Sequence, residues 1–410
     1  MTMQKVYLDY AATTPVLPEV IEAMKPYWSE KFGNASSLHS SGREARVAVE
    51  ESRKIVAKIL NCEPEEIIFT GNTTTSDNLA ILGVVRGLWN VREKTHLITT
   101  QIEHHAVLDT FKYLEKQGFT VKYLPVDKYG VVDLEELERA IKPETVLVSV
   151  MYANNEIGTI QPLSEVSAKC NPSTSLRLRS GQALGARVQG AKFGTKIYIH
   201  TDAAAVAEYL DLDVKKLGVD LLTLGSHKFG GPKGVGILYI RKGTKISPIT
   251  FGGHHENGLW PGTEPTPLIV GCAKALELAQ LKVQSSKFKV TELRDKLIKG
   301  VLGKVSGTIL TGHPTQRLPD IASFIFKGAE GEAILLRLDA EGIMVSSGSA
   351  CTSGDLRPSH VLLAMGIAAE DAHGSIRFSL GRGTTEEEID YVLEVLPRII
   401  TDLRRMTPNI

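Results

Sequence analysis

The sequence contains few cysteines and no excess of charge of either sign. Its four cysteines, at positions 62, 170, 272 and 351, form no CxxC pair and no close cluster. This spacing argues against a zinc site and against a disulfide framework. Basic and acidic residues are equal in number, 47 of each, so the charge favours neither nucleic acid nor an anionic membrane as a partner. These absences predict a protein of a reducing cytoplasm that acts on small molecules or other proteins.

Long apolar runs are also missing. The chain has no run of about 18 apolar residues, and its first residues, MTMQKVYLDYAATTP, lack the apolar core of a signal peptide. We therefore expect neither a membrane span nor secretion. A chain of 410 residues exceeds the usual size of a single hydrophobic core, which predicts one large domain and one smaller domain.

Short runs rich in β-branched residues alternate with helical patterns along the first two thirds of the chain. These runs are EIIFT near 67, HLITT near 97, VKYLPV near 122, TVLVSVMYA near 148, KIYIH near 198, DLLTL near 222 and GVGILYI near 237. The alternation predicts an α/β fold with a mostly parallel sheet covered by helices. Helices are expected from Arg43 to Leu60, and from a start between Thr73 and Asp77 to about Leu88.

The pattern changes after Thr263 to long helical stretches with few strands. IASFIF at 321–326 and GSIRFSL at 374–380 are the clearest strands of this part, which predicts an α+β domain with its boundary near residue 262. Residues 171–192, NPSTSLRLRSGQALGARVQGAK, stand where a short link is expected. We interpret them as an exposed insertion, with a partner-binding arm as the alternative.

Two residues suggest a cofactor. Lys228, in LGSHKFGGPKGVG, precedes four glycines within eight residues, a composition that allows close backbone approach. Taken alone, this motif could equally be a surface turn with a solvated lysine. Asp202 ends a predicted apolar strand, where it could cap a helix or pair with a cationic heterocycle. Together the two residues suit pyridoxal phosphate (PLP), whose aldehyde needs a lysine and whose pyridine nitrogen needs a carboxylate.

Two further motifs carry possible chemistry. FTGNTTTSDNL, residues 69–79, combines a strand, a glycine, hydroxyls and a helix N-terminus, which favours an anion such as the PLP phosphate. Thr73 and Thr74 could instead only cap the helix. SSGSACTSG, residues 346–354, surrounds Cys351 with small flexible residues, which suits either a reactive thiol or an incidental loop residue.

Taken in order, these motifs make the chain resemble the cysteine desulfurases of the aminotransferase class V, fold-type I PLP-dependent family, in the branch with an SSGSACTS cysteine loop. The motifs are YLDYAATTPV, FGNASSLHSSGREAR, EHHAVL, NNEIGTIQP, HTDA, SHKFGGPKGVG, PGTEPTPLIVG, GHPTQRLPDIASF, PSHVLLAMG and SIRFSLGRGTTEEEID. The resemblance implies a large PLP-binding domain, residues 15–262, with a seven-stranded sheet. It also implies a small domain, residues 1–14 and 263–410, that carries the Cys351 loop.

The resemblance implies a role for each matching residue. Lys228 binds PLP covalently and moves protons, His104 stacks on the ring and assists proton transfer, and Asp202 pairs with the pyridine nitrogen. The other residues implied around the cofactor are Asn155, Thr73, Thr74, Ser226, His227 and Thr263. Thr263 reaches the phosphate of a neighbouring subunit, which implies a homodimer.

For the substrate, the resemblance implies L-cysteine, with its carboxylate bound by Asn34, Asn155 and Arg377. Cys351 takes the sulfur as a persulfide and leaves L-alanine, while the other cysteines are inert. The persulfide then passes to a protein acceptor, such as an iron–sulfur scaffold protein or a thiolation enzyme.

Four positions depart from the family's usual motifs: Thr75 replaces an acid, Ala205 a glutamine, Gly225 a serine and Trp260 an arginine. Each lost hydrogen bond is worth on the order of 1 kcal/mol, which affects rate and cofactor retention more than reaction type. Two alternatives remain, a related enzyme acting on selenocysteine and a catalytically impaired homologue that serves as a scaffold.

Overall fold

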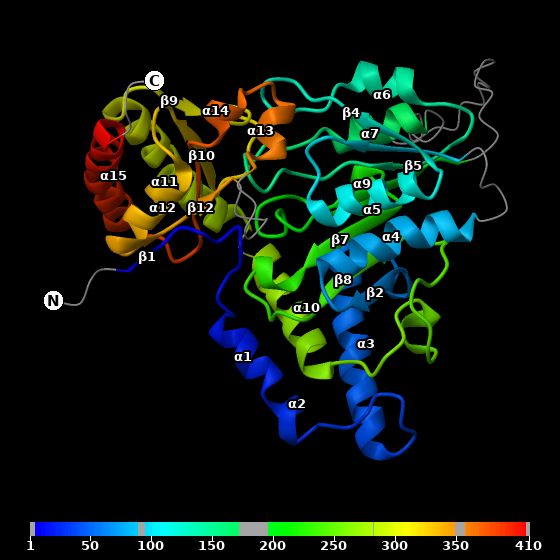
Figure 1. Cartoon of the computed structure of the whole chain (residues 1–410). Coiled ribbons are helices and arrows are strands. Elements are labelled where there is room, and N and C mark those ends of the chain that lie inside the picture. Colours follow the sequence, from blue (N-terminus) through cyan, green and yellow to red (C-terminus); the bar gives the residue numbers. More distant parts are fainter. Residues whose placement is uncertain (1–4, 89–94, 172–195, 282, 349–356, 407–410) are drawn as a thin grey trace.

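A computed structural model of the chain describes residues 5–88, 95–171, 196–281, 283–348 and 357–406 (Figure 1). Cys351 and residues 172–192 of the expected insertion lie outside the described residues. Within the described part of the chain, none of the helices combines the length and apolarity that crossing a bilayer requires.

The larger sheet has seven strands, as expected. Its order is β2 (Ile67–Thr70), β8 (Gly236–Ile240), β7 (Leu221–Gly225), β6 (Tyr198–Asp202), β5 (Thr145–Ser149), β3 (His96–Thr100) and β4 (Thr120–Leu124). All neighbours pair in parallel except those of β8, which runs antiparallel to both β2 and β7. Each strand coincides with one of the predicted β-branched runs, so the predicted α/β class is confirmed.

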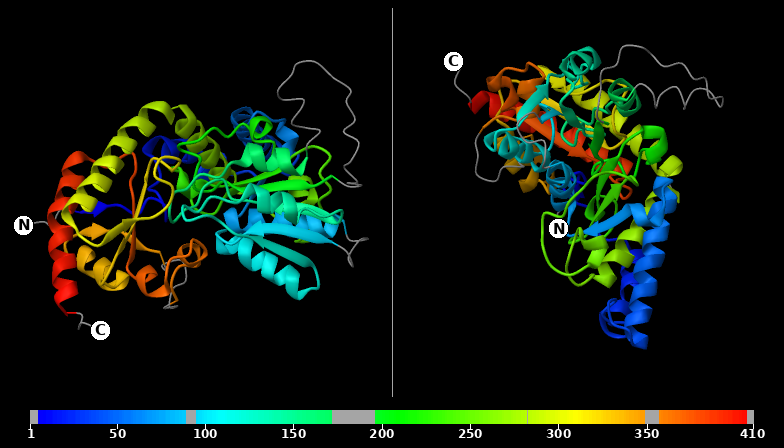
Figure 2. Two further views of the ribbon diagram at one scale, coloured as in Figure 1. Left: turned by 90° about the horizontal axis from the view of Figure 1, so that it is seen from above. Right: turned by 90° about the vertical axis from the view of Figure 1, so that its right-hand side faces the viewer.

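Helices cover both faces of this sheet because its strands are apolar on both sides. Ile67 and Phe69 of β2 point into one core and Ile68, between them, into the other. The first core contains residues of α1 (Pro18–Met24), α3 (Ser40–Leu60), α6 (Leu134–Ala140), α7 (Leu163–Cys170), α9 (Val214–Leu217) and α10 (Thr266–Leu281). The second core contains residues of α4 (Thr73–Gly87) and α5 (His105–Lys116) (Figure 2).

The predicted helices are present with small shifts at their ends. α3 begins at Ser40, three residues before the expected Arg43, because the His39 ring accepts a hydrogen bond from the Gly42 N–H and caps the helix (3.3 Å). α4 begins at Thr73, within the expected range, and ends at Gly87, one residue early.

A smaller antiparallel sheet has the order β12 (Ser346–Ser347), β13 (Ser375–Ser379), β10 (Ile321–Phe326) and β9 (Thr308–Leu310). It shares a core with α11 (Val283–Lys304), α12 (Gly331–Ala340) and α15 (Glu386–Met406). Near the N-terminus, β1 (Val6–Tyr7) pairs in parallel with β11 (Ile343–Met344), so this first segment joins the smaller core. The shorter helices are α1 (Pro18–Met24), α2 (Pro26–Ser29), α9 (Val214–Leu217), α13 (His360–Ala364) and α14 (Ala369–Ala372).

The packing of helix α10 indicates to which domain residues 266–281 belong. The expected boundary near residue 262 stays a prediction. However, Ile269 and Leu276 of α10 are buried in the same core as Val49 and Val56 of α3. This packing favours a boundary after residue 281, since α10 buries its apolar face against the larger sheet's helical layer.

Candidate active site

A cavity of about 410 Å³ lies at the carboxyl ends of the parallel strands of the larger sheet. Eight of the predicted site residues line it: Thr73, Thr74, His104, Asn155, Asp202, His227, Lys228 and Arg377. Asp202 is the last residue of β6, Arg377 lies on β13 of the smaller sheet, and the other six come from segments that follow β2, β3, β5 and β7. The larger sheet therefore collects side chains that are far apart in the sequence.

Lys228 ends a short 3-10 turn, Ser226–Lys228, that follows β7. Its Nζ donates hydrogen bonds to the carbonyls of Ala11 (2.6 Å) and Ala12 (2.9 Å). The N-terminal segment, attached through β1, thus forms one wall of the cavity and holds the amine there.

Asp202 is the last residue of β6 and is only 6% exposed. Its Oδ1 accepts a hydrogen bond from the Ala204 N–H (2.9 Å). Burial and the nearby Asp77 carboxylate raise the pKa of Asp202, and His104 acts in the opposite direction. A cation placed against this carboxylate would favour its ionised form, so Asp202 suits a cationic ring nitrogen.

His104 precedes α5 and caps it. Its Nδ1 accepts a hydrogen bond from the Ala106 N–H (3.1 Å), so the proton of the neutral ring lies on Nε2. Burial lowers the pKa of His104, and the Lys228 ammonium lowers it further, against the opposing effect of Asp202. At neutral pH the ring is therefore uncharged, with an N–H available on the side away from its helix.

The N-terminus of α4 provides a site for an anion. Asn72 caps the helix by accepting a hydrogen bond from the Thr75 N–H (2.9 Å), and Thr75 Oγ1 accepts one from the Asn72 N–H (3.1 Å). Thr75 thereby closes the capping box in place of the family's acid. Thr73 Oγ1 is buried and has no hydrogen-bond partner among the described residues. An unpaired hydroxyl beside free helix N–H groups suits a phosphate.

Arg377, on β13, is 5% exposed and also lines the cavity. Its Nη2 lies 2.8 Å from Asp9 Oδ1, and its Nη1 donates to the Asn155 carbonyl (3.0 Å). These contacts hold the guanidinium in one orientation. A planar cation held in this way can bind a carboxylate with two parallel hydrogen bonds.

The other four predicted residues are not part of this cavity as described. Three of them lie elsewhere in the structure, and the fourth lies outside the described residues. Asn34 is exposed, and its Oδ1 accepts a hydrogen bond from the Ser36 N–H (2.9 Å). The Ser226 hydroxyl is buried against Gly231, where an added Cβ would overlap it. Thr263 lines a separate cavity of about 70 Å³. Cys351 lies outside the described residues.

Sequence reasoning missed three buried or half-buried acids around the site: Asp9, Asp77 and Glu103. Asp77 Oδ1 accepts a hydrogen bond from Thr223 Oγ1 (2.6 Å), and burial raises the pKa of Asp77 to about 7. Burial raises the pKa of Glu103 to about 8. Glu103 directly precedes His104 in EHHAVL, and this position beside a strand end was the signal available in the sequence.

The fold and this site define the class of protein. A mostly parallel seven-stranded sheet between helices, with lysine, aspartate and a helix N-terminus around one cavity at its carboxyl edge, is the architecture of fold-type I PLP-dependent enzymes. The Thr73 hydroxyl, which has no hydrogen-bond partner in the described part of the chain, and the buried Asp202 carboxylate fit the two ends of that cofactor.

The aminotransferase class-V family profile matches residues 6–177 and 183–392, and the chain belongs to this family. The short gap in the match falls within residues 171–192. The cysteine desulfurase IscS of Dictyoglomus turgidum is 49% identical over 405 residues, which cover 99% of this chain and 97% of that protein. The cysteine desulfurase IscS of Methanosarcina thermophila is 48% identical over 403 residues, covering 98% and 94%.

Solved structures agree with these relatives. A NifS-like protein superposes with a TM-score of 0.86 at 39% identity, covering 98% of this chain and all of that one (100%). SspA in complex with cysteine superposes with a TM-score of 0.76 at 33% identity, covering 93% and 100%. The predicted membership in the cysteine desulfurases is confirmed, and the chain is an enzyme of that group.

Proposed function

We propose that this protein removes the sulfur of L-cysteine with PLP bound to Lys228, giving L-alanine and a persulfide on Cys351. The observation that supports this most is the shared cavity of Lys228, Asp202 and the N-terminus of α4. These groups match the aldehyde, the pyridine nitrogen and the phosphate of PLP in chemistry. When bound, PLP withdraws electrons from Cα of an attached amino acid, which weakens the bond between Cβ and sulfur.

The residues of the chain divide the proton transfers between them. The Lys228 amine removes the proton at Cα and returns one to the product. The Asp202 carboxylate keeps the pyridine nitrogen protonated, because an adjacent negative charge favours the cation. His104 is neutral and carries its proton on Nε2, so it can donate a hydrogen bond within the cavity.

Thr73, Thr74 and His227 are the proposed contacts to the phosphate, with Ser226 beside them and Thr263 contributed by a second subunit. His227 shares a hydrogen bond with Thr13 Oγ1 (3.2 Å), and burial lowers the pKa of His227 to about 4. The ring is therefore neutral at pH 7 and acts as a hydrogen-bonding group, not as a cation.

Arg377 is the proposed partner of the substrate carboxylate, together with Asn155 and Asn34. Asp9 and the Asn155 carbonyl orient the guanidinium before substrate arrives. Such preorganisation reduces the entropy lost when the substrate is bound in the reactive geometry.

Cys351 is the proposed sulfur acceptor. Its thiolate attacks the substrate sulfur; the new S–S bond forms as the Cβ–S bond breaks, and the electron pair stays with Cβ, which a proton completes to the methyl group of alanine. Burial raises the pKa of Cys62, Cys170 and Cys272 to about 12, so these three are protonated at neutral pH. Because the thiolate is the nucleophile, they are unsuited to this step.

The persulfide must be passed on. We propose a cytoplasmic homodimer that transfers the sulfur to a protein acceptor, such as an iron–sulfur scaffold protein or a thiolation enzyme. The composition and balanced charge of the chain are compatible with this assignment.

The test is to incubate purified protein with PLP, L-cysteine and a reductant, and to measure sulfide and alanine. Wild-type protein is expected to bind PLP with a visible absorbance band and to release both products. Lys228→Ala should reduce the rate of alanine formation by a factor on the order of 10²–10⁴, which is the usual contribution of a positioned proton-transfer group. Cys351→Ala should lose desulfuration, while Cys62→Ala, the matched cysteine control, should keep it. A colourless wild type, or full activity of Cys351→Ala, would contradict the proposal.

A further inference from the structure

The loop before α10 contains a strained turn. Glu256, Asn257 and Gly258 have φ values of 48°, 57° and 75°, so three consecutive residues are left-handed and two of them are not glycine. A non-glycine residue in this region costs of order 1–3 kcal/mol and persists only where surrounding contacts impose it. Contacts with the rest of the protein must therefore hold this turn in its left-handed conformation.

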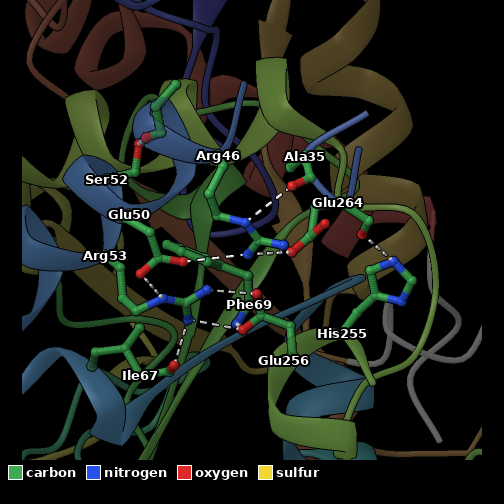
Figure 3. A network of polar contacts seen from close by, with 12 residues as sticks. Ala35, Arg46, Glu50, Ser52, Arg53, Ile67, Phe69, His255, Glu256 and Glu264 are labelled. Carbon is green, nitrogen blue, oxygen red and sulfur yellow. Dashed lines mark hydrogen bonds and ion pairs between the residues drawn. The ribbon is translucent and has the colours of Figure 1, made fainter. Parts of the chain in front are cut away.

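A buried ion pair fixes the turn (Figure 3). Arg53 of α3 forms two parallel hydrogen bonds with Glu256, Nη1 to Oε2 at 2.9 Å and Nη2 to Oε1 at 2.7 Å. The Phe69 N–H also donates to Glu256 Oε2 (2.8 Å), and Arg53 Nη1 donates to the Ile67 carbonyl (2.6 Å). Both charged residues are less than one-tenth exposed, Arg53 8% and Glu256 7%. The pair thus joins the turn to α3 and to strand β2.

Two further contacts hold the segment that follows the turn. His255 Nδ1 accepts a hydrogen bond from the Gly262 N–H (3.4 Å), and its Nε2 lies 3.0 Å from Ser36 Oγ. Glu264 Oε1 lies 3.0 Å from Arg46 Nη1. Residues 255–264 are therefore tied to α3 and to the segment before it at both ends.

Residues 260–263, between these contacts, lie beside Gly71 at the start of the segment that leads into α4. Trp260 and Thr263 line the small cavity together with Gly71. The Trp260 ring is 3.6 Å from the position that a Cβ on Gly71 would occupy. Gly71 precedes Asn72, the cap of α4, so the loop stands beside the proposed phosphate-binding end.

We propose that Arg53 and Glu256 are positioning residues that clamp the 255–258 turn. The clamp sets where Trp260 lies against the phosphate-binding end of the same chain, and how Thr263 is presented to the phosphate of a second subunit. This inference rests on the proposed function. Neither residue lines the active-site cavity, so both act through the loop. A buried ion pair is often no more stabilising than an apolar pair of similar volume, so fixing a geometry is the better reason for this one.

The test compares PLP with pyridoxal, which lacks the phosphate, on cofactor-free full-length protein. Glu256→Gln keeps the size of the side chain but loses its charge. It should raise the dissociation constant of PLP about tenfold, the equivalent of one lost hydrogen bond, and leave that of pyridoxal within about twofold. A merely structural role would weaken both compounds to the same extent.

Asp220→Asn is the matched control. Asp220 is also a buried carboxylate that bridges an arginine and a backbone N–H, Arg241 at 3.0 Å and Ile199 N at 3.1 Å. It directly precedes β7, at the amino end of that strand, whereas the active-site cavity lies at the carboxyl ends of the strands. This variant should leave the ratio of the two dissociation constants unchanged.

If Glu256→Gln fails to fold, the double variant Arg53→Met/Glu256→Gln removes both partners and leaves no unpaired buried charge. It should show the same phosphate-selective loss. A wild type that binds PLP, with variants that bind PLP equally tightly or lose both compounds alike, overturns the inference alone. A wild type that binds neither compound overturns the proposed function and the inference with it.

Discussion

Glu103 positions the backbone next to His104 through hydrogen bonds to three other segments. Its Oε1 accepts hydrogen bonds from Thr100 Oγ1 (2.7 Å) and from the Met151 N–H (2.9 Å), so it links the segments that leave β3 and β5. Its carbonyl accepts a hydrogen bond from His360 Nε2 (2.9 Å). Since His104 is the next residue, these contacts hold the backbone that places the His104 ring in the cavity.

The pKa of Glu103 makes stability depend on pH in a definite direction. Burial raises this pKa from 4.5 to about 8, so the folded protein retains a proton that the unfolded chain has lost between these values. The stability contributed by this group is fully present below pH 4.5 and is lost as the pH rises through 8. Glu103→Gln keeps the acceptor oxygen but does not titrate. Its free energy of unfolding should therefore fall less than that of the wild type between pH 5 and pH 8.

Denaturant unfolding at pH 5, 6.5 and 8 measures this difference. Glu135→Gln, at a site that is not buried, is the control and should follow the wild type. An identical pH dependence for Glu103→Gln and wild type would show that the buried carboxyl does not titrate as described.

At the scale of elements, the contact between the end of β7 and the start of α4 explains one departure from the family's motifs. The family usually has serine where this chain has Gly225. A Cβ added to Gly225 would overlap Thr73 Oγ1, so the first residue of α4 fills the space beside the strand. The hydroxyl expected from residue 225 is thus replaced by the hydroxyl of Thr73, approached from the neighbouring element.

This exchange predicts strong coupling between the two positions. Gly225→Ser alone should destabilise the protein by about 1–3 kcal/mol, because it overpacks a filled space. Thr73→Ala in the same chain removes the obstructing hydroxyl and should restore most of that loss. Equilibrium unfolding of the two single variants and the double variant measures the coupling energy. Gly303→Ser, at a helical glycine with open space around it, should show no such coupling with Thr73→Ala. Purely additive effects at 73 and 225 would refute the exchange.

At the scale of the whole molecule, the N-terminal segment and the smaller sheet complete a site that the larger sheet begins. Pairing of β1 with β11 brings Ala11 and Ala12 to Lys228, and β13 brings Arg377 to Asn155. Thr263 is exposed and does not line the active-site cavity. We propose that it contacts the phosphate in a second copy of the chain.

A mixture of two defective proteins tests this proposal. Lys228→Ala lacks the cofactor lysine, and Thr263→Ala lacks the proposed phosphate contact. If each subunit completes its partner's site, a mixed dimer contains one intact site, and an equal mixture should recover about a quarter of the wild-type activity after subunit exchange. Sulfide release, compared with the unmixed variants, measures the recovery. Recovery no better than that of the separate variants, or full activity of Thr263→Ala alone, would rule out the shared site.

The sequence by itself determined the strands, the main helices and the type of chemistry. Runs such as HLITT form strands because β-branched residues favour extended backbone locally. Asp202 ends strand β6 and the Lys228 turn follows β7, so the local strand pattern also places these two residues. The ordered motifs were sufficient to predict the enzyme class.

Only the tertiary structure decided which distant residues meet. Asp9 and Arg377 are 368 positions apart, and Arg53 and Glu256 are 203 apart. No local pattern encodes such pairs, because they depend on strand order and on which helix covers which face. The packing of α10 on α3 and the close approach of Thr73 to residue 225 could not be predicted for the same reason. Each arises from the contact of two elements that form independently.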